Sequence, residues 1–175
     1  MVQPVAFANE IINRFGGAGY IDHMKLQKLL YFSNGWWLGL TGAPLLDERP
    51  QVWRYGPVFR GVYNSFSRFG SRPIHELAPG NPFFGGAPER VPAEQLAQII
   101  PTMDWIWGEY GGKSAVQLSD ETHAPGTPWQ RIAAASNYAV QLNTEIPPAE
   151  DWQYFAQLAT QRGWTPAPFN PNAAT

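Results

Sequence analysis

The sequence predicts a mainly α fold: a single compact domain of about six to seven helices around one buried central helix, with a short β-hairpin. Residues 22–42 are apolar on nearly their whole circumference, which is typical of a helix inside a protein. Other segments carry apolar residues at helical spacing and end at glycine or proline. Hydrophobic residues make up 44% of the 175 residues, enough to form a sizeable core.

The central helix is predicted to begin after Asp22, which suits the positive end of a helix, and to stop at Gly42. Gly35 and Gly39 indicate that another helix crosses it closely. The polar residues within this stretch argue against a membrane-spanning helix; they are Lys25, Gln27, Lys28 and Asn34.

The segments on either side of it are predicted in turn. Residues 4–15 form a helix that opens at Pro4 and ends at two glycines. Residues 45–46 and 52–53 are short extended pieces of a hairpin that turns at 47–49. A third helix starts at Gly56-Pro57 and ends at Gly70.

The second half of the chain begins with an irregular connection over residues 71–92. Residues 93–110 resume helical spacing, with a kink or break expected at Pro101. Ser114 and Thr127 each open a short helix, because a glutamine follows three residues later. A last helix follows Pro147-Pro148 and ends at 163, which closes a domain spanning 1–163. Residues 164–175 are predicted to be a flexible C-terminal tail.

Composition removes several classes of function. A net charge of −2 gives no general attraction to nucleic acid or anionic lipid, and without cysteine there is no disulfide or thiolate site. The three histidines match no zinc spacing, so neither a metal nor a cofactor is predicted. No signal peptide is recognised, and the default expectation is a cytoplasmic protein without a membrane segment.

One polar cluster, LSDETH at 118–123, invites a hydrolase interpretation through Ser119, Asp120 and His123. A catalytic triad, however, meets in space from distant segments. We favour a structural interpretation, in which Thr122 and His123 hydrogen-bond the end of a helix, with a partner contact as the alternative. The protein is therefore not expected to be an enzyme.

A second cluster consists of arginines near aromatic residues. Basic and aromatic side chains together could bind single-stranded nucleic acid, but five arginines over this length are sparse, and a solvated face balanced by Asp47 and Glu48 is favoured. They are Arg49, Arg54, Arg60, Arg68 and Arg72.

Taken together, several motifs resemble the Panacea antitoxin domain, the SocA-like or phage-associated antitoxin family, from Phe7 to about Phe155. The motifs are KLQKLLYF at 25–32, GW at 35–36, GAPL at 42–45, WRYGPV at 53–58, VY at 62–63, FG at 69–70, LS at 118–119, TH at 122–123 and PW at 128–129. Departures from the family pattern are Trp37 and the start Asp22-His23-Met24.

The resemblance implies a helical protein that neutralises the toxin of a two-gene module by direct binding, or as an adaptor that delivers the toxin to the ClpXP protease. The alternative is a nucleic-acid-binding regulator of its own operon or a phage-associated regulatory protein. The resemblance identifies neither the toxin nor the oligomeric state, so a homo-oligomer is left open.

Rigid aromatic residues beside arginine are typical of protein interfaces. We therefore expect the segment 53–63 and the turn 123–129 to face the toxin, with burial of Tyr55, Tyr63 and Trp129 in the core as the alternative. The candidate partner-binding residues are Trp53, Arg54, Tyr55, Pro57, Phe59, Arg60, Tyr63, His123 and Trp129.

Overall fold

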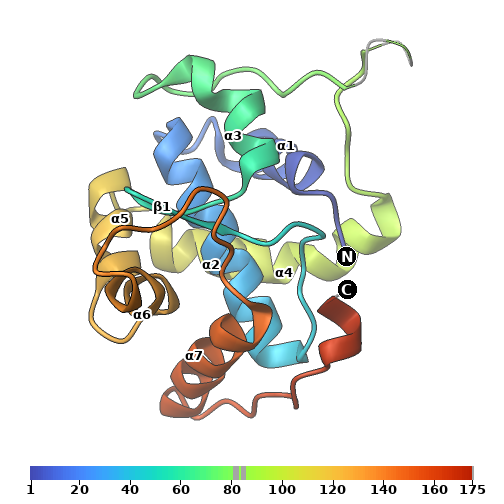
Figure 1. The fold of residues 1–175 in the computed structure, drawn as a ribbon. Helices are drawn as coiled ribbons and strands as arrows, with labels where there is room; N and C mark the ends of the chain where they lie inside the picture. Colours follow the sequence, from blue (N-terminus) through green and yellow to red (C-terminus); the bar gives the residue numbers. More distant parts are fainter. Residues whose placement is uncertain (81–82, 84–85, 175) are drawn as a thin grey trace.

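The computed structural model describes residues 1–80, 83 and 86–174, and its centre is the helix α2, His23–Thr41 (Figure 1). Asp22 caps α2, since its carboxylate accepts a hydrogen bond from the Lys25 backbone N–H at 2.8 Å. At the other end, Gly42 has a left-handed φ of 75°, which glycine adopts without strain. The predicted central helix and both of its ends are confirmed.

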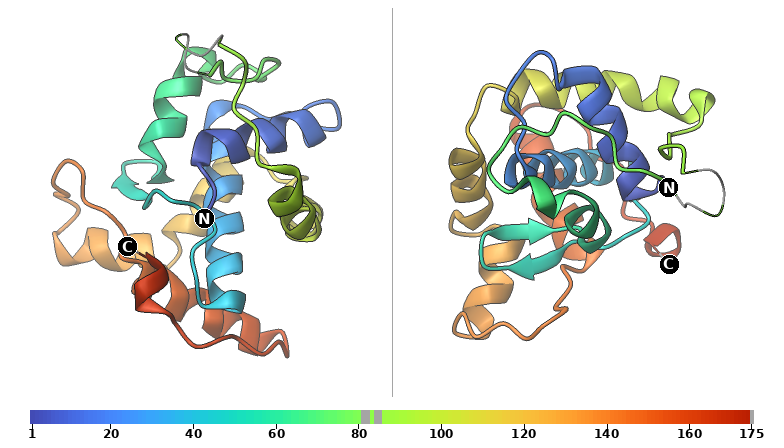
Figure 2. Two further views of the ribbon diagram at one scale, coloured as in Figure 1. Left: turned by 90° about the vertical axis from the view of Figure 1, so that its right-hand side faces the viewer. Right: turned by 90° about the horizontal axis from the view of Figure 1, so that it is seen from above.

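Six further α-helices of the described chain surround α2 (Figure 2). They are α1 (Pro4–Phe15), α3 (Arg60–Phe66), α4 (Ala93–Tyr110), α5 (Ala115–His123), α6 (Pro128–Ala135) and α7 (Pro148–Gln161). Two 3-10 turns, η1 (Ser67–Phe69) and η3 (Pro171–Ala174), complete the helical elements described. The predicted fold class, mainly α with a small hairpin, is confirmed.

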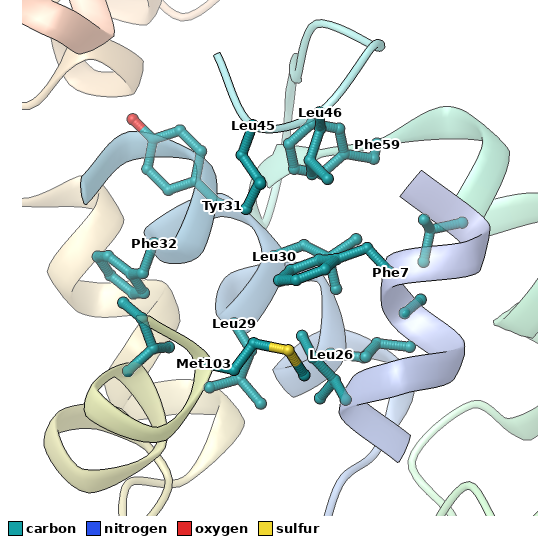
Figure 3. Close-up of a cluster of buried hydrophobic side chains, with 14 of the residues drawn as sticks. Phe7, Leu26, Leu29, Leu30, Tyr31, Phe32, Leu45, Leu46, Phe59 and Met103 are labelled. Carbon is teal, nitrogen blue, oxygen red and sulfur yellow. The ribbon is translucent and has the colours of Figure 1, made fainter. Parts of the chain in front are cut away.

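The core forms where α2 meets its neighbours (Figure 3). Phe7 belongs to α1 and Met103 to α4, and Phe59 immediately precedes α3. All three side chains are buried. Each large apolar side chain buried in this way contributes about 1.5–3 kcal/mol. The labelled members that α2 and the loop after it supply are Leu26, Leu29, Leu30, Tyr31, Phe32, Leu45 and Leu46.

Two of the polar residues of α2 fix loops to the helix. Buried Gln27 accepts a hydrogen bond from the Phe59 N–H at 2.8 Å and donates one to the Phe59 carbonyl at 3.1 Å. Buried Asn34 accepts from the backbone N–H groups of Leu45 and Leu46 at 3.1 and 3.0 Å. The side-chain amide of Asn34 thus satisfies backbone donors that strand pairing would otherwise satisfy. The loop after α2 is therefore held to the helix without belonging to a sheet.

The hairpin lies later in the chain than predicted. Strands β1 (Gln51–Trp53) and β2 (Gly56–Val58) pair antiparallel, and the chain turns at 54–55 instead of at 47–49. Leu46 makes only an isolated parallel bridge with Val2. The predicted pairing of 45–46 with 52–53 is therefore wrong.

The chemistry of Gly56-Pro57 explains this error. Gly56 has a φ of 99°, which allows the chain to reverse direction just before it. Pro57 then lies opposite Val52 in β2, where a residue without an N–H is tolerated at the edge of a small sheet. The third helix consequently begins at Arg60 and not at Gly56-Pro57.

The other helices follow their sequence signals. Ser114 and Gln117 form a reciprocal capping box at α5, and the Thr127 hydroxyl caps α6. The helix α4 continues through Pro101 as a single element, so the chain does not break there, and the kink stays a prediction.

The segment predicted as a flexible tail makes specific contacts. The Trp164 ring packs against Trp36, with centroids 5.7 Å apart. The Ala167 N–H donates to the Leu40 carbonyl at 3.2 Å, and Trp152 donates its indole N–H to the Ala167 carbonyl at 3.0 Å. Residues 164–174 thus lie along the end of α2 and beside α7, while the mobility of this segment and the domain boundary at 163 stay predictions.

Candidate functional site

The tip of the hairpin, residues 53–56, is exposed at Arg54 and Tyr55 and is contacted by side chains of α5 and α6. Trp129 of α6 donates its indole N–H to the Trp53 carbonyl at 2.9 Å. His123, the last residue of α5, places Nε2 3.3 Å from the Arg54 carbonyl. The backbone of the tip is therefore held in place while side chains remain on its outer side.

A third anchor completes this arrangement. The Ser119 hydroxyl donates to the Tyr55 carbonyl at 3.2 Å. The His123 ring lies edge-on to Trp129, with centroids 3.8 Å apart, and its Nδ1 is 2.5 Å from the Ser119 carbonyl. Trp129 and Ser119 thus hold the Trp53 and Tyr55 carbonyls by hydrogen bonds, and the His123 ring lies against the Arg54 carbonyl between them.

The nine predicted partner-binding residues gather in one region but differ in burial. Arg54, Tyr55 and Arg60 are exposed, and Tyr55 exposes 62% of its surface. Phe59 is 0% exposed and belongs to the hydrophobic core, so it has no surface to offer a partner. The partly exposed members are Trp53, Tyr63 and His123, and the other buried ones are Pro57 and Trp129.

Two hollows flank the tip. The larger, of about 590 Å³, lies between Trp53 and the loop after α6. This loop carries Tyr138 and Leu142, which expose 63% and 94% of their surface. Sequence reasoning missed both residues; the alternate large apolar residues Tyr138, Val140 and Leu142 were the available signal.

The smaller hollow, of about 290 Å³, lies on the other side, between the start of α2 and Tyr63. His23 and Lys28 come to it from α2, and Arg54 and Tyr55 come from the tip. The tip is therefore an exposed ridge of one arginine and one tyrosine between two partly apolar hollows, a shape suited to binding another protein.

Residues 26–130 match the family model described as "Antitoxin SocA-like, Panacea domain". The chain belongs to the SocA-like antitoxin family. It is also 34% identical over 126 residues to Antitoxin SocA of Caulobacter vibrioides (strain NA1000 / CB15N), across 72% of this chain and 67% of that relative. No solved structure matches the chain significantly.

The matched part of the SocA-like chain includes the hairpin, α5 and the start of α6, and therefore all nine candidate residues. The loop with Tyr138 and Leu142 lies outside it. The larger hollow thus combines one wall from the Panacea domain match with one wall from beyond it.

The Panacea domain does not assemble the hydrolase considered from the sequence. The Ser119 hydroxyl donates to the Tyr55 carbonyl, and Asp120 is exposed instead of orienting His123. Thr122 and His123 instead bond the Ser119 carbonyl, as the structural interpretation predicted. No group of three or more potential metal ligands occurs among the described residues.

Most of the arginines considered for nucleic-acid binding are engaged with neighbours. Arg49 lies 3.5 Å from Glu145 and Arg68 lies 2.9 Å from Glu76, each a pair of partly exposed side chains. Paired arginines do not form the continuous basic track that nucleic acid requires.

Among the helices of the described chain, none is long and apolar enough to span a membrane.

Replacement of Trp129 by phenylalanine tests the anchoring of the tip. Trp129→Phe removes the indole N–H and leaves the Trp53 carbonyl without this donor, so the free energy of unfolding should fall by about 1 kcal/mol. Urea unfolding measures the loss, and faster amide exchange at residues 53–56 should accompany it. Unchanged exchange there would contradict the anchoring role.

Proposed function

We propose that this protein is the antitoxin of a two-gene toxin–antitoxin module and that it neutralises its cognate toxin by direct contact. The contact surface is the hairpin-tip surface, defined as Trp53, Arg54, Tyr55, Arg60, Tyr63 and His123. The observation that carries the proposal is the exposed Arg54–Tyr55 ridge on a tip whose Trp53 and Tyr55 carbonyls accept hydrogen bonds from Trp129 and Ser119. Membership of an antitoxin family supplies the class of partner.

The physical properties of this surface support a protein partner. The Arg54 guanidinium lies over the Tyr55 ring, 5.4 Å from its centroid, so the two side chains form one amphipathic knob. The Trp53 ring packs against the Tyr63 ring, with centroids 4.7 Å apart, which supports the hairpin where it meets α3. Preordered aromatic and arginine side chains lose little entropy on binding, which is why they dominate the energy of many interfaces.

Co-expression with the neighbouring reading frame tests the proposal. The neighbour should arrest growth alone, and this chain should restore growth and co-purify with the neighbour's product. Cells lacking the ClpXP protease separate two routes: contact neutralisation should persist there, whereas adaptor-mediated delivery to ClpXP should be lost. If growth is not restored in either strain, the antitoxin proposal fails.

The double substitution Arg54→Ala/Arg60→Ala should weaken binding of the toxin about 10- to 100-fold without changing stability. Both side chains are exposed, and truncation of an interfacial arginine commonly costs more than 1 kcal/mol. Affinity is measured by calorimetry with the purified toxin and stability by thermal unfolding. The matched control is Arg14→Ala, an arginine at the end of α1 that pairs with Asp104. Equal affinities of the double variant and the control would refute this surface.

A further inference from the structure

The smaller hollow brings together three basic side chains with no acidic one. It is lined by His23 and Lys28 from α2 and Arg54 from the tip, together with aromatic and aliphatic walls. None of its lining residues is aspartate or glutamate. The nearest carboxylate in the sequence, Asp22, is engaged with the backbone N–H of Lys25 and does not line the hollow.

Lys28 is an unusual residue to find here. Its side chain is 1% exposed, and its ammonium donates to the Pro57 carbonyl at 3.0 Å. No carboxylate of the described chain lies within ion-pair distance of Lys28, and burial lowers the pKa of its ammonium to about 7. A buried cation without a counter-charge is costly, and an anion beside it would remove much of that cost.

His23 supplies a second unmet requirement. Its Nε2 is buried and has no hydrogen-bond partner among the described residues. The ring is held edge-on to Tyr63, with centroids 4.9 Å apart, so its position is fixed. Gln27, the other polar residue of α2 in this hollow, is already satisfied by Phe59. A polar atom that is buried, positioned and unpaired indicates a missing partner group.

Arg54 closes the hollow at its exposed side. Its guanidinium makes no ion pair among the described side chains, in contrast to Arg49 and Arg68 on the same side of the protein. The cationic end of Arg54 is therefore available to an incoming acid. The apolar walls, which include Trp53 and Tyr55, suit the methylene groups of that residue.

We propose that this hollow is a carboxylate-binding site that receives an acidic side chain, aspartate or glutamate, of the bound toxin. The proposal rests on the antitoxin function above and gives the chemistry of one contact. The volume of about 290 Å³ suits one or two side chains and not a folded element. A net charge of −2 and the pairing of the neighbouring arginines favour a single acid over a phosphate chain.

The direct test uses the isolated full chain and two small probes of matched shape. N-acetylglutamate methylamide should bind at millimolar concentrations, shifting the NMR signals of the His23 ring and the Tyr55 and Gly56 amides and raising the pKa of Lys28. The neutral N-acetylglutamine methylamide should bind at least about tenfold more weakly. Equal binding of the two probes, or no saturable shift with either, would overturn the proposal. Inorganic phosphate binding at least as tightly as the glutamate probe would also overturn it.

The second test uses the toxin from the co-expression experiment. Lys28→Met keeps the aliphatic stem, and His23→Phe keeps the ring packing on Tyr63. Each should lower affinity for the toxin at least about tenfold. Lys28→Met should remain folded, because an apolar replacement of a buried charge is usually tolerated, and His23→Phe provides the result if it does not.

The outcomes separate the two proposals. If the wild-type chain does not restore growth, the antitoxin function itself is rejected. Protection and binding by wild type, with unchanged affinity in folded Lys28→Met or in His23→Phe, rejects only the carboxylate site.

Discussion

Gly35→Ala is expected to lower the free energy of unfolding by about 3 kcal/mol, although alanine is the better helix former. A Cβ at Gly35 would overlap the Phe155 ring of α7, and one at Gly39 would meet Phe155 and the Ala156 backbone at 2.9–3.0 Å. The two glycines therefore allow α2 and α7 to cross closely. The Phe155 ring and the α7 backbone cannot move away from an added Cβ without disturbing the core, because Phe155 is 0% exposed.

The matched control is Gly108→Ala, another glycine within a helix. Nothing lies within 4 Å of a Cβ added there, and the residue is exposed on α4. This change should raise stability by about 0.5–1 kcal/mol through helix propensity alone. Urea unfolding of both variants distinguishes the two effects. If Gly35→Ala were also stabilising, the close crossing of α2 and α7 would be wrong.

The sequence predicted the close approach at the glycines, the caps of α2, α5 and α6, and the helices other than the start of α3, because these depend on local patterns. Gly35 and Gly39 interrupt an apolar stretch, and Asp22 and Gly42 bound it, so no knowledge of distant segments was needed. The predicted close approach to another helix is confirmed by Phe155, although the sequence did not identify α7 as that partner.

The hairpin and the candidate site depend on contacts that lie far apart in the chain. Asn34 binds the N–H groups of Leu45 and Leu46, so the first candidate strand has no donors left for a sheet. Whether Tyr55 is exposed and Phe59 is buried follows from where the turn falls. The sequence identified the correct region for the site but could not assign which side chains reach its surface.

The polar residues of α2 show the same limit. Lys28 stood out in the sequence as a break in an apolar stretch. Its pairing with Pro57 requires the hairpin to lie over α2, with Gly56 leaving room, because a Cβ there would lie 2.5 Å from the Lys28 ammonium. Only the structure could turn this irregularity into a candidate binding residue.

Stability should fall as pH rises from about 4 to 7, and Asp151→Asn should remove much of this fall. Asp151 is buried in α7 and accepts a hydrogen bond from the Tyr31 hydroxyl at 2.7 Å. Burial raises the pKa of Asp151 from 3.8 to about 7, the Tyr31 hydrogen bond opposes this, and the Glu150 charge adds to it. Between these values the folded protein keeps a proton that the unfolded chain has released, so each rise in pH favours unfolding.

The full effect is on the order of 4 kcal/mol, from about three pKa units at 1.36 kcal/mol each. Asparagine does not titrate and keeps an oxygen for the Tyr31 hydroxyl, so urea unfolding of Asp151→Asn at pH 4.5, 5.5 and 6.5 should give a much flatter profile. Measurements stop near pH 7 because burial lowers the pKa of Lys28 to about 7, so above that value the unfolded chain holds the extra proton and stability rises with pH. Parallel profiles for wild type and Asp151→Asn would show that Asp151 is ionised in the folded core throughout this range.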